Sequence, residues 1–264
     1  MQENWSERTE LLIGSQEYLK LKNAHVLVIG LGGVGAYAAE QLVRAGIGTL
    51  TMIDGDLIHL TNLNRQLPAL MSTLGQAKTE VLAQRFKQIN PDLNLCYYTE
   101  YIRDERMIEI LNAASYDYLI DAIDTLSPKL YLLYHAYQLH IPVVSAMGSG
   151  GKLNPSQLHI CDISQTYMCP LADVLRKRLH KLGIYTGIYA VFSPEEIPSR
   201  SVRLVENELN KKTMVGTISY MPAIVGCMCA SVVVRVLLGY SISSDLPVPR
   251  NIKKKIASEM KINT

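Results

Sequence analysis

Several residues in the first half of the chain combine a glycine turn with acidic and basic side chains. The apolar run Val26–Ile29 leads into the turn Gly30-Leu-Gly-Gly-Val-Gly35, and an Ala-rich segment follows. A second apolar run ends in Asp54. The polar run Asn62-Leu-Asn-Arg-Gln66 and then Lys78 come after it. This combination predicts a nucleotide bound through its phosphates, with two cations placed on the polyphosphate.

The glycine turn has a physical reason. Glycine tolerates the φ values of a sharp strand-to-helix reversal, and a side chain there would hold a phosphate away from the helix N-terminus. Asp54 follows at the end of a second strand, where a carboxylate meets a ribose diol. On this part alone an NAD-dependent dehydrogenase remains an alternative, and Arg65 and Lys78 taken singly are compatible with surface charge. The occurrence of Arg65 and Lys78 together with these motifs favours ATP, because dinucleotide-binding folds need neither the polar run nor a Gly75-Gln-Ala-Lys78 helix start.

Residues from about Arg8 to Gly151 resemble the adenylating domain of the ubiquitin-activating-enzyme-like superfamily, which includes the molybdopterin and thiamine adenylyltransferases. The resemblance implies that Asp54 holds the ribose of ATP and that Arg65 and Lys78 contact its phosphates. It places Asp124, in Ile120-Asp-Ala-Ile-Asp124, near Mg²⁺ and the reacting phosphate, with Asp121 as a companion that caps or orients. The implied nucleotide-binding set is Gly30, Gly32, Gly33, Gly35, Asp54, Asp56, Asn62, Asn64, Arg65, Lys78 and Asp124.

The opening run Arg8-Thr-Glu-Leu-Leu-Ile-Gly14 resembles the segment whose arginine reaches the partner subunit's site in this superfamily. Arg8 is therefore a candidate catalytic residue in trans, beside Arg65, Lys78 and Asp124, and this role requires a homodimer. In the implied reaction a carboxylate attacks the α-phosphate of ATP, forming an acyl-adenylate and releasing pyrophosphate. Fixed Arg, Lys and Mg²⁺ charges stabilise the negative charge that develops on the phosphate oxygens.

The second half of the chain bears on which carboxylate is activated. Residues 145–193 resemble the tRNA threonylcarbamoyladenosine dehydratases in their Gly-rich turn, the Asp162-Ile-Ser step and the basic helix Asp173–Lys181, as does the run Gly216–Pro222. This branch implies activation of the threonylcarbamoyl carboxylate on the adenosine beside the anticodon of tRNA, then closure of that side chain with net loss of water. It also implies a monovalent cation on main-chain carbonyls of the Gly148–Gly151 loop, and it leaves a sulfur-relay protein partner open.

Other functions stay open beside this one. An adenylyltransferase for a ubiquitin-like sulfur carrier uses the same chemistry, but many such proteins hold zinc with two C-x-x-C pairs, and the five cysteines here form none. A nucleotide-sensing scaffold with a silent site has no chemical need for Arg65, Lys78 and Asp124. An NAD oxidoreductase fits less of the chain. Cys169 is the one cysteine in a polar, loop-like sequence context, where the dehydratases commonly carry Asp, so a reactive role and an incidental thiol both stay open.

Composition and charge bound the class of protein. The 264 residues are 48% hydrophobic with a net charge of +2, which suits one substantial core and argues against a polycationic DNA-binding protein. Basic residues cluster at Arg176–Lys181, which could be a tRNA contact or a solvated helix face. A second basic cluster at Lys253–Lys261 is interpreted as a frayed tail.

A polar N-terminus and unpaired cysteines predict a cytoplasmic protein. Met214–Tyr240 is long and apolar enough to cross a membrane, but its small residues favour a helix buried in a core or dimer seam.

The elements that would position these residues alternate along the chain. We predict an α/β fold, a Rossmann-like mostly parallel sheet with helices on both faces and a C-terminal strand, loop and helix elaboration. Ligand-binding residues then meet at the carboxyl ends of the strands. We expect one ThiF-type adenylating domain over 1–264, with a nucleotide-binding core at 24–150, a substrate or dimer portion at 151–240 and a basic tail at 241–264. The predicted strands are 26–29, 49–53, 94–99, 117–121 and 142–146, and the predicted helices are 7–22, 33–45, 75–89, 104–113, 127–140, 170–182 and 221–238.

Overall fold

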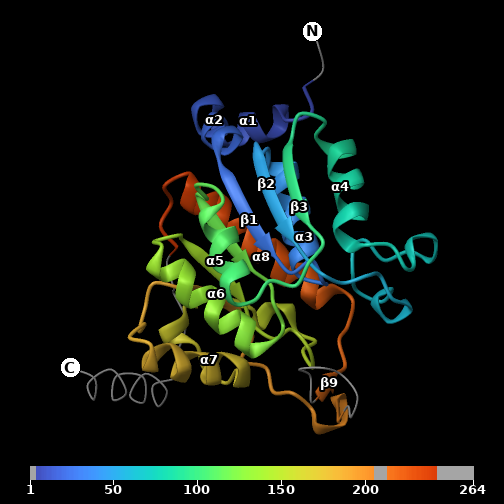
Figure 1. Cartoon of the computed structure of the whole chain (residues 1–264), viewed down its shortest axis with the longest axis vertical. Helices are drawn as coiled ribbons and strands as arrows, with labels where there is room; N and C mark the ends of the chain where they lie inside the picture. The colour runs from blue at the N-terminus through green and yellow to red at the C-terminus, as the bar shows by residue number, and fades with distance from the viewer. Residues whose placement is uncertain (1–3, 205–212, 243–264) are drawn as a thin grey trace.

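A seven-stranded sheet forms the centre of the molecule (Figure 1). The computed structural model describes residues 4–204 and 213–242, so the predicted basic tail lies almost wholly outside the described residues. The strand order is β3-β2-β1-β4-β5-β7-β6, and of these seven strands β6 alone pairs antiparallel. This confirms the predicted Rossmann-like sheet. The strands are β1 His25–Ile29, β2 Thr49–Ile53, β3 Asn94–Tyr98, β4 Tyr118–Asp121, β5 Val143–Ala146, β6 His159–Asp162 and β7 Tyr189–Phe192; a separate antiparallel pair is β8 Val202–Leu204 with β9 Thr213–Val215.

The central strands are apolar throughout because both faces of the sheet are buried. Side chains alternate across a strand, so Val26 and Val28 of β1 enter one hydrophobic cluster while Leu27 and Ile29 enter the other. In register, Ile29 of β1 lies opposite Ile53 of β2 and Asp121 of β4. The residues that follow these three strands therefore emerge at the same edge of the sheet.

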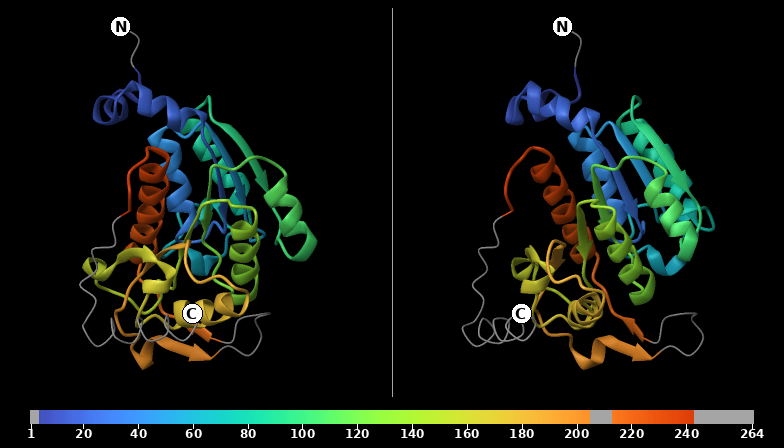
Figure 2. Two further views of the ribbon diagram at one scale, coloured as in Figure 1. Left: turned by 90° about the vertical axis from the view of Figure 1, so that its left-hand side faces the viewer. Right: turned by 60° about the vertical axis from the view of Figure 1, so that its left-hand side comes forward.

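Helices cover both faces of the sheet (Figure 2). One cluster of buried side chains joins the sheet mainly to three helices and also includes Leu21 of a fourth, and the second cluster joins the sheet to three others. Two short helices lie at the end of the molecule where β1 begins (Figure 1). The first group is α3 Gly35–Ala45, α4 Lys78–Ile89 and α8 Tyr220–Leu237; the second is α5 Asp104–Asn112, α6 Leu126–Gln138 and α7 Pro170–Lys181; the short pair is α1 Glu7–Ile13 and α2 Ser15–Asn23.

Helix α8 packs closely on α3. A Cβ atom at Gly226 would lie 2.3 Å from the carbonyl oxygen of Val34 and 3.0 Å from the amide nitrogen of Ala38, so only glycine permits this approach. The buried packing expected from the small residues of this segment is thus present. The helix has 18 residues, a mean hydropathy of 1.8 and a buried share of 44%, and among the described helices it is the one long and apolar enough to cross a membrane.

Helix α4 begins later than the sequence predicted. The prediction put its start at Gly75, whereas the structure begins the helix at Lys78. Gly75 has a φ of +80°, and the chain from 75 to 78 pairs with 56–58 through an Ala77–Leu57 bridge. This pairing makes Lys78 the first residue of the helix and directs it toward the end of β2.

Candidate active site

The glycine turn after β1 is pressed against the turn after β4. A Cβ atom at Gly30, whose φ is +88°, would lie 2.7 Å from the carbonyl oxygen of Ala122, and one at Gly35 would lie 1.8 Å from the carbonyl oxygen of Gly30. These two glycines are therefore required by the fold itself. Helix α3 starts at Gly35 without a side-chain cap, so its first N–H groups point to the turn as a phosphate-binding helix end does.

The other two glycines face the polar run and α8. A Cβ atom at Gly32 would lie 3.7 Å from Nε2 of Gln66, and one at Gly33 would lie 3.0 Å from Cβ of Pro222 and 3.4 Å from the carbonyl oxygen of Arg65. The structure thus brings the backbone of Arg65 to the glycine turn, although they lie 30 residues apart in the chain. A larger residue at 33 would crowd both neighbours.

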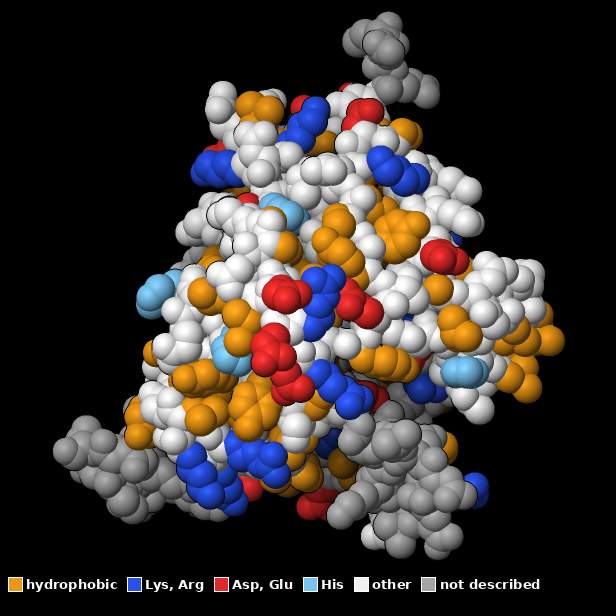
Figure 3. Space-filling view, in the orientation of Figure 1, with side chains coloured by type: hydrophobic (Ala, Val, Ile, Leu, Met, Phe, Trp, Pro, Cys, Tyr) orange, Lys and Arg blue, Asp and Glu red, His pale blue; other side chains and the backbone are white. Residues whose placement is uncertain are grey.

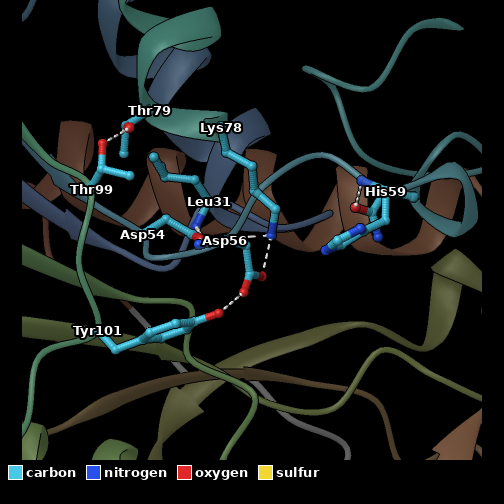
Figure 4. A network of polar contacts seen from close by, with 9 residues as sticks. Leu31, Asp54, Asp56, His59, Lys78, Thr79, Thr99 and Tyr101 are labelled. Atoms are coloured by element: carbon cyan, nitrogen blue, oxygen red, sulfur yellow. Dashed lines mark hydrogen bonds and ion pairs between the residues drawn. The ribbon is translucent and has the colours of Figure 1, made fainter. Parts of the chain in front are cut away.

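Asp54 joins the end of β2 to the glycine turn. Its carboxylate accepts the N–H of Leu31 at 2.6 Å and the N–H of Asp56 at 2.7 Å (Figure 4). Burial raises the pKa of Asp54, and the nearby Lys78 only partly offsets this rise. The carboxylate is held in one orientation at the edge of the sheet, which is the placement that a ribose-binding acid needs.

Lys78 is almost fully buried between two carboxylates. Its Nζ lies 2.5 Å from Oδ2 of Asp56 and 3.7 Å from Oδ1 of Asp54. The hydroxyl of Tyr101 donates to the other oxygen of Asp56 (Figure 4). The Tyr101 ring also lies against Gly55. Burial alone would raise the pKa of Asp56, but the hydrogen bonds from Lys78 and Tyr101 outweigh burial and lower that pKa. The hydrogen bond between Tyr101 and Asp56 raises the pKa of Tyr101 to about 12, so Tyr101 stays a neutral donor.

The polar run forms a short 3₁₀ turn, Leu60–Asn62, and the loop after it. The buried Asn62 accepts the N–H of His59 through Oδ1 at 2.9 Å, and Asn64 donates through Nδ2 to the carbonyl of Thr217 at 2.9 Å. The Arg65 guanidinium donates to Oδ1 of Asn64 at 2.9 Å and to the carbonyl of Thr61 at 3.0 Å. Both acceptors are neutral, and among the described residues Arg65 forms no ion pair, so its charge is not neutralised locally.

Asp121 and Asp124 have different surroundings. Asp121 is fully buried, and its Oδ2 lies 2.7 Å from Nζ of Lys129 and accepts the hydroxyl of Ser145 at 2.7 Å. Lys129 also donates to the carbonyl of Ile123 at 3.0 Å, while Asp121 accepts the N–H of Ile123 at 3.1 Å. Asp121 therefore orients the β4–α6 turn from inside, and Asp124 is exposed on that turn. The sequence reasoning missed Lys129, although a single charge within an apolar helix was its available signal.

A cavity of about 250 Å³ lies beside Asp124. It is lined by the first turn of α6 and by a residue of the β3–α5 loop, and its lining residues are Arg103, Thr125, Leu126, Ser127 and Pro128. The cavity opens on the same edge of the sheet as Asp54 and Lys78.

No group of three or more His, Cys, Asp or Glu side chains suited to a metal occurs within 4–204 and 213–242. Mg²⁺ often uses only one or two carboxylates together with substrate phosphates and water, so a single exposed carboxylate such as Asp124 is compatible with that ion. In the second half, the buried Lys152 donates to the main-chain carbonyl of Glu195. Cys169, whose sequence context is loop-like, lies directly before α7 with its side chain buried in the second hydrophobic cluster.

Arg8 lies apart from the other predicted residues. It is exposed on α1, at the end of the molecule opposite the carboxyl ends of the strands (Figure 1). Within one chain the structure does not bring Arg8 to Lys78 or Asp124.

Known proteins are similar to this chain in sequence and in fold. A family model described as the ThiF family matches residues 7–262. The tRNA threonylcarbamoyladenosine dehydratase of Bacillus subtilis (strain 168) is 40% identical over 188 residues, 71% of this chain and 74% of that protein. The crystal structure of the Escherichia coli tRNA N6-threonylcarbamoyladenosine dehydratase in complex with ATP has a TM-score of 0.80 and 33% identity, over 89% of this chain and 95% of its own. The Escherichia coli (strain K12) sulfur carrier protein ThiS adenylyltransferase is 35% identical over 136 residues, 51% of this chain and 53% of that protein.

The family match spans the glycine turn, the polar run, the β4–α6 turn and the closely packed α8. The carboxyl-edge cluster of Asp54, Asp56 and Lys78 lies within it. The chain therefore belongs to the ThiF family.

Proposed function

We propose that this chain is an ATP-dependent tRNA threonylcarbamoyladenosine dehydratase. The observation that carries the proposal is the buried Lys78 beside Asp54, at the mouth of an uncapped glycine-rich helix start. A backbone match over most of the chain to a dehydratase solved with ATP supports the same nucleotide. Because tRNA and ATP meet in the cytosol, we place the activity in the cytoplasm.

The residues divide the work of the first step. Asp54 accepts hydrogen bonds from the ribose hydroxyls, and the N–H groups at the start of α3 donate to phosphate oxygens. Arg65 and Lys78 supply fixed positive charge as the substrate carboxylate attacks the α-phosphorus and the bond to pyrophosphate breaks. Asp124 would hold Mg²⁺, which neutralises charge on the phosphates when it is bound.

The second step needs no nucleophile from the protein. A nucleophilic atom of the threonylcarbamoyl-adenosine side chain attacks the acyl carbon, AMP leaves, and the ring closes with net loss of water. Among the described cysteines, Cys96 and Cys227 are exposed, and burial raises the pKa of Cys227. A raised pKa lowers the thiolate fraction, which disfavours a thioester-forming role for that residue.

The alternative is an adenylyltransferase acting on the C-terminus of a ubiquitin-like sulfur carrier. The similarity to such a protein covers about half of each chain, whereas the dehydratase similarity covers about three quarters of the relative. No C-x-x-C pair occurs in the sequence. Both observations favour the dehydratase.

Nucleoside mass spectrometry tests the proposal. The protein is incubated with ATP, Mg²⁺ and tRNA that carries threonylcarbamoyladenosine. We expect that nucleoside to lose the mass of one water in an ATP-dependent reaction, and Asp124→Asn to abolish the loss while retaining the fold. Unchanged tRNA, together with pyrophosphate exchange that requires a small carrier protein, would move the function to the alternative.

We further propose a homodimer in which Arg8 serves the partner's site. Leu11 and Leu12 on the same helix are 87% and 84% exposed, and such an apolar pair is costly to leave in water. A second copy that covers α1 would bury them and bring Arg8 toward a neighbouring carboxyl edge.

A further inference from the structure

Helix α7 distributes its basic side chains between two faces. Arg176 is turned inward: its guanidinium donates to the carbonyl and hydroxyl of Thr166 at 2.9 and 2.7 Å and lies 3.1 Å from Oδ1 of Asp173. With a side chain that is only 13% exposed, Arg176 fixes the start of α7 on the preceding turn. The basic run seen in the sequence is therefore not one uniform patch.

The outward face of α7 carries the remaining cations. Lys177, Arg178 and Lys181 recur at the spacing of one helix face, opposite the buried Leu175 and Leu179. Lys177 is 71% exposed and pairs with Asp173 at 2.8 Å. Arg178 and Lys181 are exposed, and within the described ranges neither forms an ion pair. This face thus presents unneutralised charge one helical turn wide.

An aromatic side chain continues this face beyond the helix. Tyr185 is 44% exposed, and its ring lies 5.0 Å from the ring of His180, tilted by 39°. The His180 contact holds the Tyr185 ring in place while leaving part of it open. Exposed rings beside cations form the usual platform for an unpaired nucleic-acid base.

The position of α7 suits a large substrate. The helix lies at the end of the molecule away from α1 and α2, which is the end where the strands carry their carboxyl edge (Figure 1). Lys and Arg side chains gather over this end, while acidic side chains gather higher on the same side (Figure 3). A strand bound along α7 would therefore pass on the catalytic side of the sheet.

We propose that Lys177, Arg178, Lys181 and Tyr185, here named the α7 face, form a docking surface for the tRNA substrate. The cations contact backbone phosphates, and Tyr185 stacks on one unpaired base. The proposal rests on the proposed function and adds the place where the RNA lies. RNA fits better than an acidic protein, because an exposed ring beside a row of cations can stack on an unpaired base while the cations contact the phosphates.

The test compares two double charge reversals. Arg178→Glu/Lys181→Glu alters the α7 face, and Lys20→Glu/Lys22→Glu, on exposed α2 at the other end, changes the net charge by the same amount. Filter binding of unmodified tRNA transcript is measured over a series of KCl concentrations. We expect the first variant to bind about tenfold or more weakly, with a log–log salt slope shallower by about 1.5, and the control to match the wild type.

Two further readouts separate the roles. Tyr185→Ala should weaken binding roughly tenfold without changing the salt slope, because stacking releases no counterions. ATP affinity, measured without RNA, should be the same in all variants, and circular dichroism confirms that each is folded. If Arg178→Glu/Lys181→Glu binds tRNA with the affinity and slope of the control, the α7 face is not the docking surface.

The same samples distinguish this proposal from the proposed function. If the wild type dehydrates threonylcarbamoyladenosine and the α7 variant has an unchanged KM for tRNA, the docking surface alone is refuted. If the wild type leaves the nucleoside unchanged, the dehydratase assignment fails whatever the affinities are. The expected result is a raised KM for tRNA with kcat retained.

Discussion

At the scale of single residues, two carboxylates share one ammonium group and yet behave differently. Burial raises the pKa of Asp54, whereas hydrogen bonds from Lys78 and Tyr101 lower the pKa of Asp56. As the pH falls, Asp54 therefore takes up a proton before Asp56 does. The two acids are therefore suited to separate tasks: Asp54 to the proposed ribose contact, which protonation would remove, and Asp56 to holding Lys78 in place.

This order predicts how ATP use depends on pH. Protonation of Asp54 removes an acceptor for the ribose, so KM for ATP should rise at a pH above the ordinary aspartate value of about 3.9. Because its folded pKa is raised, the charge of Asp54 costs stability above that pKa, and the cost disappears on acidification. The lowered pKa of Asp56 gives stability that is lost only below about pH 4.

KM for ATP measured between pH 4 and 8 checks the first part of this prediction, with stability followed by urea unfolding at the same pH values. Asp54→Asn is the matched variant, because it keeps the shape and cannot titrate. It should have a high KM that no longer responds to pH. A wild-type KM that stays flat throughout would show that Asp54 does not carry the ribose contact.

Tyr101 is the second residue to test. Without its hydroxyl, Asp56 loses one of two donors and holds Lys78 more tightly, so Lys78 is less available to phosphate. We expect Tyr101→Phe to raise KM for ATP roughly three- to tenfold with kcat little changed, since the lost bond involves a charged acceptor. Steady-state kinetics with ATP varied provides the measurement, and Tyr97→Phe, on the exposed edge strand β3, is the control. A fall in kcat alone would contradict the positioning role.

At the scale of elements, a fully buried ion pair between the end of β4 and α6 holds the β4–α6 turn in place. Lys129 and Asp121 are both fully buried, and removal of one partner leaves an uncompensated charge. Lys129→Met should therefore lower the free energy of unfolding by about 3–5 kcal/mol, and adding Asp121→Asn should restore part of it. Lys22→Met on exposed α2 should change it by less than about 0.5 kcal/mol. Urea unfolding measures all three, and additive losses in the double variant would rule out the pairing.

Elements are also where the sequence was most informative. Strand and helix order followed from apolar runs, so β2 was predicted at its observed bounds and the sheet was confirmed. The start of α4 was not predictable, because it depends on a bridge between Leu57 and Ala77 that is formed only in the folded chain. The burial of Cys169 was not predictable for the same reason, since the apolar side chains around it come from segments distant in the sequence.

For the site, residue types and spacing predicted Asp54 and Lys78, which the structure brings to one edge. Tyr101 was missed because a hydrogen bond between segments 45 residues apart leaves no mark in the local sequence, whereas Lys129 was missed although it is a single charge within an apolar helix. The roles of Asn62 and Asn64 as nucleotide contacts stay predictions, and their observed bonds support the loop that carries Arg65. Spacing thus predicts which residues meet at an edge, but not which of them hold the others in place.

At the scale of the whole molecule, one chain does not bring all the predicted catalytic residues to the same edge of the sheet. Arg8 lies on α1 beside exposed Leu11 and Leu12, at the end opposite the carboxyl edge. A site that uses Arg8 must therefore draw it from a second copy. In the proposed homodimer, a two-fold axis would let each protomer supply its Arg8 to the site of the other.

Mixed dimers test this arrangement. A dimer of one Arg8→Ala protomer and one Asp124→Ala protomer contains one complete site if Arg8 acts in trans, since the first protomer keeps its Asp124 and receives Arg8 from the second. Each variant alone should be inactive. Co-expression in equal amounts makes about half of the dimers mixed, each with one of two sites intact, so about a quarter of wild-type activity should return. Size-exclusion chromatography with light scattering confirms the dimer, and a mixture that remains inactive despite dimerising would show that Arg8 does not serve the partner's site.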